Sequence, residues 1–433
     1  MSSIFRWKRT LRRLAIVLFS SFICSYLIIS SIFSKSNTPN GNSFLFPDFY
    51  YTENENYQSN IDLININQTF QQYLSVMQAK FENRSGKVLQ YRCEQAWKCG
   101  GLGDRLRGLT ATFVMALFLN ESFSCHWSSP SDLDAYFELP FGAYLNVSSP
   151  DVPAHLLERR SHFTVKSINV VDNDTAIETL FRKPFSNFIT TMKTVDYLRI
   201  NINSWLPVQF IMADPIYGQV RSYYNLTGIP VDHLLSQSLR FLLSKPRKRL
   251  ENITNKVLSL MGNNVGGNET VVKIGVHIRL ENSDWGEDGR VSYNQIGCFA
   301  IETKKIIESF DESSNISIFI ASDSEAAVDE FSSQIAQIQP SVKSKIFFLN
   351  GPIGHIDRLI LDDNKLSIGK VNEKTFGDWL LLTKMDFLVI SRSSFGETAA
   401  IHSLAPTRRF QHWHTAKCQF ENYKLNNLHM ESS

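Results

Sequence analysis

The sequence predicts an α/β protein in which two Rossmann-like domains face a cleft, preceded by one N-terminal transmembrane helix. The first observation is an uncharged run at residues 14–33. The second is an alternation of apolar strand-like runs with helical segments, which is the order that forms parallel sheets. The third is length, because roughly 350 residues follow a polar linker, too many for one hydrophobic core and suitable for two.

The uncharged run 14–33 is long enough to span about 30 Å of hydrocarbon as a helix. Five basic residues and no acidic residue precede it, namely Arg6, Lys8, Arg9, Arg12 and Arg13. The positive-inside rule therefore predicts that residues 1–13 are a cytosolic tail, that 14–33 is a signal-anchor, and that the protein is a type II membrane protein. The alternative is a cleaved signal peptide, but its apolar core is about 7–15 residues and ends in a small-residue site, for which residues 30–33 are poor.

Asparagine acceptors for N-linked glycans support a lumenal location for the rest of the chain. Because an attached glycan has no room in a core, each acceptor also predicts an exposed position in a glycoprotein. The acceptors are Asn67, Asn83, Asn120, Asn146, Asn173, Asn225, Asn252, Asn268 and Asn315.

Charge and cysteine content narrow the function classes. The formal charge is +2, but the tail holds five of the 44 basic residues and none of the 42 acidic ones, so the remainder stands at −3. This balance does not favour nucleic acid as a partner. Cys24 lies in the predicted span, and the lumenal compartment permits disulfides among the other cysteines. These number five, so one thiol is left over, and their connectivity stays open: Cys93, Cys99, Cys125, Cys298 and Cys418.

Residues 34–80 are rich in Asn, Ser, Tyr and Pro without sustained periodicity, which predicts a stem. The first domain is expected at 81–260. It opens with a strand at 88–93, the glycine loop Gly100-Gly101-Leu102-Gly103, a helix to Leu119 and a second strand at 122–127, which together make a parallel βαβ unit. The pattern of residues 150–260 is difficult to read, which leaves the position of the domain boundary open within this stretch.

The second domain, 261–433, shows the alternation more clearly. Apolar runs predict strands at 271–279, 316–321, 345–349 and 387–391. Helical spacing predicts helices at 325–335, 375–385 and 395–404. The resulting order, β-α-β-α-β-α, predicts a second parallel sheet.

Polar residues follow the ends of these strands, which is where ligands of parallel sheets bind. Arg279 could hold a pyrophosphate through its planar donor fork, and Ser393 and Ser394 could add donors at a helix N-terminus. Asp323 could accept hydrogen bonds from a base or ribose. The structural alternatives are an ion pair for Arg279, a structural histidine at His277, a helix N-cap at 323–324, and a capping box that joins Ser394 to Glu397.

The run Gly100–Gly108 together with His277-Ile278-Arg279 resembles the fucosyltransferase superfamily that includes plant xyloglucan and rhizobial nodulation fucosyltransferases. The resemblance covers these two motifs and residues 376–402. It implies a GT-B fold and inverting transfer of L-fucose from GDP-fucose without an obligatory metal or other cofactor. In this sequence Leu280-Glu281-Asn282 follows Arg279, where many members carry a second arginine or a glycine-aspartate pair, so the donor is less firmly indicated than the fold.

The resemblance also implies a division of labour, with an acceptor-side first domain and a nucleotide-sugar-binding second domain. Arg279 would meet the donor pyrophosphate, Asp323 the guanosine portion, and the loop at 393–396 the phosphates. The full set of expected donor-binding residues is Gly101, Gly103, Arg105, His277, Arg279, Asp323, Ser393, Ser394, Phe395 and Gly396.

Metal-dependent chemistry would need an Asp-x-Asp after a strand. Asp132 and Asp134 lack the strand, and Asp172 and Asp174 flank the glycan acceptor Asn173, so neither pair is favoured and no metal site is expected. The glycine loop also lacks the third glycine of a dinucleotide fingerprint. The spacing of five further residues matches no compact zinc pattern, and the histidines among them are expected at the surface: Cys298, His402, His412, His414 and Cys418.

The predicted mechanism is a single displacement at the anomeric carbon. Arg279 neutralises the departing GDP, and a carboxylate, Asp104, Glu281 or Asp284, takes the acceptor proton. The function implied is a Golgi-membrane fucosyltransferase whose partners are a sugar nucleotide, a glycan acceptor and the membrane, with homo-oligomer formation left open. Two alternatives remain: a transferase for another sugar nucleotide, and an inactive glycan-binding cell-surface protein of the same fold.

Overall fold

The structure, a computed structural model, describes residues 68–77, 79–80, 87–94, 99–140, 165–171, 176, 191–192, 194–213, 218–223, 225–262, 271–280, 291–311, 314–339, 345–353, 365–411 and 418–423. All of these belong to one compact unit, Gln58–Ser433. The predicted cytosolic tail and membrane anchor lie outside the described residues. Within the described part, none of the helices has the length and apolar character needed to cross a bilayer.

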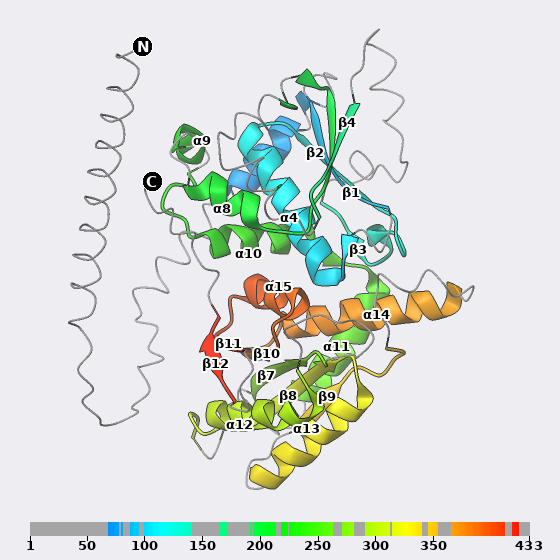
Figure 1. Cartoon of the computed structure of the whole chain (residues 1–433), viewed down its shortest axis with the longest axis vertical. Coiled ribbons are helices and arrows are strands. Elements are labelled where there is room, and N and C mark those ends of the chain that lie inside the picture. The colour runs from blue at the N-terminus through cyan, green and yellow to red at the C-terminus, as the bar shows by residue number, and fades with distance from the viewer. Residues whose placement is uncertain are drawn as a thin grey trace, which may run out of the picture. The chain divides into compact units, whose positions relative to one another are not determined.

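The first sheet has four parallel strands in the described part of the chain, in the order β2-β1-β5-β4. Figure 1 labels β1, β2 and β4 of this sheet. Its strands are β1 (Val88–Cys93), β2 (Ser122–Trp127), β4 (Val165–Asn169) and β5 (Tyr197–Asn201). The predicted strands 88–93 and 122–127 are β1 and β2, and they pair in parallel as a βαβ unit requires. Every residue of β2 is buried, in keeping with a strand that is covered on both faces.

Helix α4 (Leu102–Leu119) connects β1 to β2 and is buried on nearly every side, because its sequence is apolar almost all round. A Cβ atom at Gly108 would lie 1.7 Å from the carbonyl oxygen of Ile202, so glycine permits this close packing. Asn120 ends the helix in the left-handed conformation with φ 52°.

The other named elements before the second sheet are η2 (Leu133–Ala135), β3 (Phe137–Glu138), α8 (Leu206–Ala213), α9 (Gly218–Tyr223), α10 (Val231–Leu242), β6 (Lys245–Pro246) and α11 (Lys248–Gly262).

Residues 68–77 are helical and pack into the core, which corrects the prediction of a stem that extends to residue 80. Phe70 and Tyr73 are fully buried, and the ring of Phe70 lies 5.4 Å from that of Phe113 in α4. The hydroxyl of Tyr73 donates to the carbonyl of Glu121 at 2.6 Å. Five of its ten residues are Gln, Thr or Ser, a composition typical of a linker. Its apolar face is recognised only from the core residues against which it packs.

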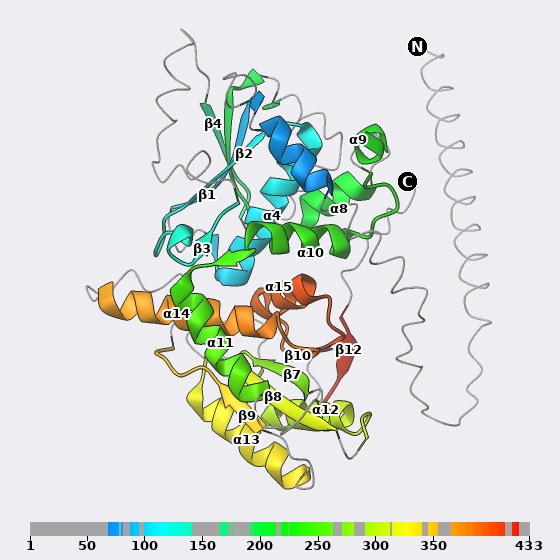
Figure 2. The ribbon, with the colours of Figure 1, turned by 180° about the vertical axis from the view of Figure 1, so that it is seen from behind.

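The second sheet has six strands within the described residues, in the order β12-β11-β10-β7-β8-β9 (Figures 1 and 2). All neighbours pair in parallel except β11 and β12. The strands are β7 (Val271–Ile278), β8 (Asn315–Ser322), β9 (Lys345–Phe348), β10 (Phe387–Ile390), β11 (Thr407–Phe410) and β12 (Phe420–Asn422). The order reverses between β7 and β10, as in doubly wound nucleotide-binding folds.

Helices cover both faces of the second sheet. The alternation along β8 directs Ile318 and Ile320 into one cluster with α12 and α13, and Phe319 and Ala321 into another with α11, α14 and α15. This latter cluster is continuous with the core around α4 and the first sheet. The helices are η5 (Tyr293–Gln295), α12 (Ile296–Ile307), α13 (Glu325–Ile338), α14 (Lys365–Leu382) and α15 (Ser394–Ser403).

The predicted strands and helices of the second sheet are confirmed to within three residues at most ends. The start of α14 is the largest difference, since the helix begins at Lys365 rather than at residue 375.

Two disulfides are formed, Cys93–Cys99 and Cys298–Cys418, and Cys125 is a free buried thiol.

Candidate functional site

The loops that follow β1 and β10 meet at one place. A Cβ atom on Gly103, the second residue of α4, would lie 2.1 Å from the backbone carbonyl carbon of Ser394, the first residue of α15. Only glycine allows this approach. The glycine loop of the first sheet and the loop 393–396 of the second therefore form one site, at which the N-terminal ends of two helices, with their N–H groups and positive dipole ends, come together.

Arg279 stands immediately after β7, at the reversal of strand order where ligands of such sheets bind. Its backbone N–H donates to the Oγ of Ser391 at 3.1 Å, and its Nε lies 3.3 Å from Oδ2 of Asp323. The other oxygen of Asp323 accepts the N–H of Leu280 at 3.0 Å. Residues at the ends of β8 and β10 thus hold both the backbone and the guanidinium of Arg279.

This geometry changes the interpretation of Asp323. The sequence assigned it to the guanosine portion of a donor, whereas both its carboxylate oxygens face the end of β7. Asp323 pairs with the Arg279 side chain, so the ion pair considered as an alternative for Arg279 is present, and the contact of Asp323 with guanosine stays a prediction. Ser324 is the N-cap of α13, with its Oγ 3.3 Å from the N of Ala327, so the capping alternative is confirmed at 324.

His277 is buried at the end of β7 and supports the same residues. Its Nδ1 lies 3.1 Å from Ser391 Oγ, and its ring stacks on Phe395 at 5.0 Å. Burial, and to a smaller degree the neighbouring Arg279, lowers its pKa to about 3, so the imidazole is neutral at physiological pH. The same Ser391 hydroxyl accepts the N–H of Arg279, so it joins His277 to the backbone of Arg279.

Gly396 also serves this packing. A Cβ atom there would lie 2.9 Å from His277 Nδ1 and 3.1 Å from the Cβ of Ile390. The predicted site residues His277, Phe395 and Gly396 therefore lie together. Their contacts with one another build the loop that carries Ser393 and Ser394.

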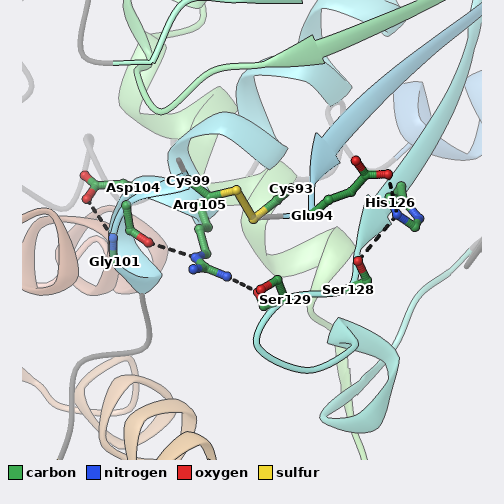
Figure 3. The surroundings of a disulfide bond; sticks show 10 residues. Cys93, Glu94, Cys99, Gly101, Asp104, Arg105, His126, Ser128 and Ser129 are labelled. Carbon is green, nitrogen blue, oxygen red and sulfur yellow. Dashed lines mark hydrogen bonds and ion pairs between the residues drawn. A yellow bond between two sulfur atoms is a disulfide. The ribbon is translucent and has the colours of Figure 1, made fainter. Parts of the chain in front are cut away.

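The glycine loop is fixed by a disulfide and a carboxylate (Figure 3). The Cys93–Cys99 bond ties the end of β1 to the loop, and the N–H of Gly101 donates to Oδ2 of Asp104 at 3.1 Å. Asp104 sits in the first turn of α4, where a negative charge complements the helix dipole. Of the three carboxylates predicted as general base, Asp104 is described, while Glu281 and Asp284 lie outside the described residues.

Arg105, which the sequence assigned to donor binding, is fully buried. Its Nε donates to the carbonyl of Gly100 at 2.8 Å, and its Nη1 donates to the carbonyl of Ser129 (Figure 3). The guanidinium also lies 5.5 Å from the centre of the Trp127 ring. Burial lowers its pKa to about 10, which still leaves it charged. With no exposed surface, Arg105 acts on the site by holding the glycine loop against the loop that follows β2.

The capping prediction for α15 was one residue out of register. The N-cap is Ser393, whose Oγ accepts the N–H of Phe395 at 3.3 Å. Glu397 does not close a capping box with Ser394, because its carboxylate is engaged by Arg107 of α4 and, at 2.8 Å, by Nη1 of Arg409. The Ser393 hydroxyl therefore stabilises the helix start.

A second polar cluster lies at the ends of β1 and β2 and was not predicted. Glu94 Oε1 lies 3.2 Å from Nε2 of the buried His126, and Ser128 Oγ lies 3.4 Å from the same nitrogen (Figure 3). Arg92 Nη2 donates to both oxygens of Glu94 at 2.6 and 2.5 Å. In the sequence, the only sign of this cluster is that its polar residues lie at the ends of two predicted strands.

The described part of the chain holds no group of three or more His, Cys, Asp or Glu side chains arranged to bind a metal ion. Desolvation and the neighbouring Asp134 raise the pKa of Asp132. The pair Asp172 and Asp174 lies outside the described residues, as do His412 and His414. Cys298 and Cys418 form a disulfide, which accounts for their presence without zinc.

His402 is buried at the end of α15, which corrects the expectation of a surface histidine.

Four glycan acceptors are described. Asn120, Asn225 and Asn252 are exposed and Asn315 is half-buried at the start of β8. The other predicted acceptors lie outside the described residues.

Comparison with solved structures identifies the class of fold, an α/β fold similar to that of GT-B fucosyltransferases. A point mutant of Arabidopsis thaliana FUT1 in complex with GDP matches with a TM-score of 0.52 and 13% identity, over 85% of this chain and 81% of that chain. Fucosyltransferase NodZ from Bradyrhizobium matches with a TM-score of 0.40 and 14% identity, over 75% of this chain and 95% of that one. POFUT1 in complex with GDP matches with a TM-score of 0.39 and 11% identity, over 75% and 98%.

No family model matches the chain, and no curated protein does. At the identities found, the similarity establishes the fold. The predicted resemblance to fucosyltransferases is confirmed at that level.

Proposed function

We propose that this chain is a glycosyltransferase that transfers L-fucose from GDP-fucose to a hydroxyl group of a glycan or glycoprotein. The observation that supports this most strongly is the placement of Arg279. It stands at the strand-order reversal of a Rossmann-like sheet, oriented by Asp323 and Ser391. The fold it belongs to is similar to that of FUT1, whose structure contains GDP.

The proposed reaction is a single displacement with inversion. The acceptor oxygen attacks the anomeric carbon from the face opposite GDP, its proton passes to a base, and the bond between the anomeric carbon and the phosphate oxygen breaks. Arg279 stabilises the charge that develops on the pyrophosphate. The N-terminus of α15 adds N–H donors beside it, while the neutral His277 holds Ser391 without adding charge.

Asp104 is the proposed base among the described carboxylates. It lies in the first turn of α4, directly after Gly103, which contacts the start of α15, and it accepts the N–H of Gly101. Residues 14–33 and the lumenal glycan acceptors support a type II orientation in the Golgi membrane, with this site in the lumen.

A donor screen tests the proposal. The full-length protein would be titrated with GDP, UDP and CMP while its melting temperature is followed, and incubated with GDP-fucose, GDP-mannose and UDP-sugars in the presence of a mixed glycan acceptor. We expect stabilisation by GDP and transfer from GDP-fucose. Transfer from a different donor would identify another sugar-nucleotide transferase. Glycan binding without turnover of any donor would instead support the inactive cell-surface protein.

The proposed metal independence has its own experiment. Because an arginine, rather than an Asp-x-Asp metal, is proposed to neutralise the leaving group, transfer is expected to continue at an unchanged rate in excess EDTA. Loss of turnover in EDTA that manganese restores would contradict this and direct attention to Asp172 and Asp174.

A further inference from the structure

Helix α15 carries the loop 393–396 and is held near its N-terminus by the first sheet's helix α4. Arg107 of α4 donates through Nη2 to Oε2 of Glu397, one turn into α15. Glu397 is buried, and its other oxygen bonds Arg409 of β11 at 2.8 Å. A buried carboxylate between two arginines resists displacement, since removal of either partner leaves buried charge poorly compensated.

The C-terminal end of α15 is held by the other first-sheet helix that contacts it, α10. Arg240 Nε donates to the carbonyl of His402 at 2.7 Å, and its Nη2 donates to the carbonyl of Ser403 at 2.8 Å. Ser236 Oγ also donates to the His402 carbonyl, at 3.0 Å. Carbonyls at a helix end lack intrahelical partners, and a cation there is favoured by the dipole. Side chains from a different helix thus supply the C-terminal cap of α15.

These contacts place both ends of a second-sheet helix under the control of first-sheet residues. The backbone contact between Gly103 and Ser394 adds a third point of attachment. The hydrophobic cluster that runs without interruption from α4 to α15 fills the space between.

We propose that Arg240 is a positioning residue for the donor site: from α10 it holds the C-terminal end of α15, and so sets the position of the 393–396 loop at the opposite end of that helix. Arg107 and Glu397 complete this clamp at the N-terminal end. The site is then pre-organised by the first sheet, and donor binding does not separate α15 from α4 and α10. The consequence for nucleotide binding rests on the proposed function, whereas the clamp itself does not.

The test uses the full-length protein with Arg240→Ala, the conservative Arg240→Lys, and Ser236→Ala as a milder change at the same carbonyl. Arg221→Ala is the matched control, because Arg221 Nη1 donates at 2.7 Å to the carbonyl of Ile211 near the end of α8, a contact of the same kind away from α15. Hydrogen exchange of the amides at 394–403 is measured without ligand, and GDP affinity is measured by calorimetry.

We expect Arg240→Ala to raise exchange throughout α15 on the order of tenfold and to weaken GDP binding on the order of tenfold, with no change in Arg221→Ala. Arg240→Lys, which supplies a single mobile donor group, should fall between wild type and alanine. Unchanged exchange in α15 would overturn the clamp. Faster exchange with unchanged GDP affinity would overturn the positioning role and leave a purely structural contact.

Two further outcomes separate this inference from the proposed function. Failure of the wild-type protein to bind GDP would count against the proposed function, while the exchange measurement would still decide the clamp. If Arg240→Ala does not fold, Arg240→Lys and Ser236→Ala decide by the same two measurements.

Discussion

At the scale of single residues, Arg279 illustrates how neighbours turn a charge into a directed donor. Its sequence neighbours place it at a strand end, but Asp323 and Ser391, 44 and 112 positions away, fix the direction of its side chain and backbone. His277 next to it is neutral, because its pKa is lowered by burial and, to a smaller degree, by Arg279, so it does not repel the Arg279 guanidinium as a protonated imidazole would.

Substitution of Arg279 by lysine keeps the charge and removes the planar fork. Loss of oriented stabilisation of a leaving group lowers the rate by about 10² to 10³, roughly 2.7–4 kcal/mol, so we expect kcat/KM for GDP-fucose to fall by about two orders of magnitude with a melting temperature close to that of wild type. Arg408→Lys is the matched control, because Arg408 is also paired with an acidic residue, Glu302, but lies on β11. Transfer at the wild-type rate would show that the pyrophosphate is held elsewhere.

Buried His402 makes a prediction about stability in acid. Burial, followed by the nearby Arg240 and Lys384, lowers its pKa to about 3, below the ordinary value of 6.5. The unfolded chain therefore binds a proton first, and stability that is present above about pH 6.5 is lost as the pH falls toward 3, at up to about 1.4 kcal/mol per pH unit. His277 acts in the same direction.

The substitution His402→Phe keeps an aromatic ring beside Trp379, which lies 5.3 Å away, and removes the titrating group. We expect the loss of unfolding free energy between pH 7 and pH 5 to shrink by about 2 kcal/mol in urea titrations at the two pH values. His233→Phe on α10 is the control. An equal loss in wild type and His402→Phe would show that His402 does not contribute to the acid sensitivity.

At the scale of elements, several helices pack against both sheets, which their own sequences do not show. Phe376 of α14 stacks on Tyr136 at 4.5 Å, so this second-sheet helix also packs on the loop after β2. Helices α14 and α15 are thereby part of both the second-sheet fold and the attachment of the two sheets. The same reasoning applies to the helix at 68–77, which lies inside the core rather than in a stem.

A fragment that begins at Lys80 lacks Phe70, Tyr73 and Met77, all buried. We expect it to be markedly less stable than a fragment that begins at Gln58, and Phe70→Ala in the longer fragment to lower the unfolding free energy by about 3–5 kcal/mol. Chemical denaturation of the two fragments and of Phe70→Ala measures this. Gln71→Ala, at an exposed position of the same helix, should leave stability unchanged. Equal stability of the two fragments would return residues 68–80 to the stem.

At the scale of the whole molecule, the described chain is built around two main sheets, parallel except at β12, whose strand-end loops meet where Gly103 touches Ser394. The strand order of the second sheet puts Arg279 at the reversal where ligands of such sheets bind, and the glycine loop of the first sheet lies beside the loop 393–396. One hydrophobic cluster contains buried residues of both sheets, so the hydrophobic core is continuous across the boundary between the two predicted domains.

Much of this organisation could be predicted because it depends on local pattern. The strands β1, β2 and β7, the glycine loop, and the position of Arg279 at a strand end follow from hydrophobic periodicity and from glycine at a close approach, which neighbouring residues encode. The middle of the chain could not be read in this way. Its short strands β4 and β5 show no clear alternation and are defined by the strands with which they pair. Helix α10 does carry a helical pattern, in Leu234, Leu235, Leu239 and Leu242, all buried, and the prediction for this region missed it.

The amino-acid sequence by itself determined the α/β class, the succession of the main strands and helices along the chain, and the resemblance of its two motifs to fucosyltransferases. Only the tertiary structure decided that Arg105 is buried, that Asp323 faces Arg279, that Ser393 rather than Ser394 caps α15, and that Cys125 is the free thiol. The physical reason is distance along the chain. Arg107 and Glu397 are 290 residues apart, and contacts between such positions depend on how the two sheets pack, which no local pattern encodes.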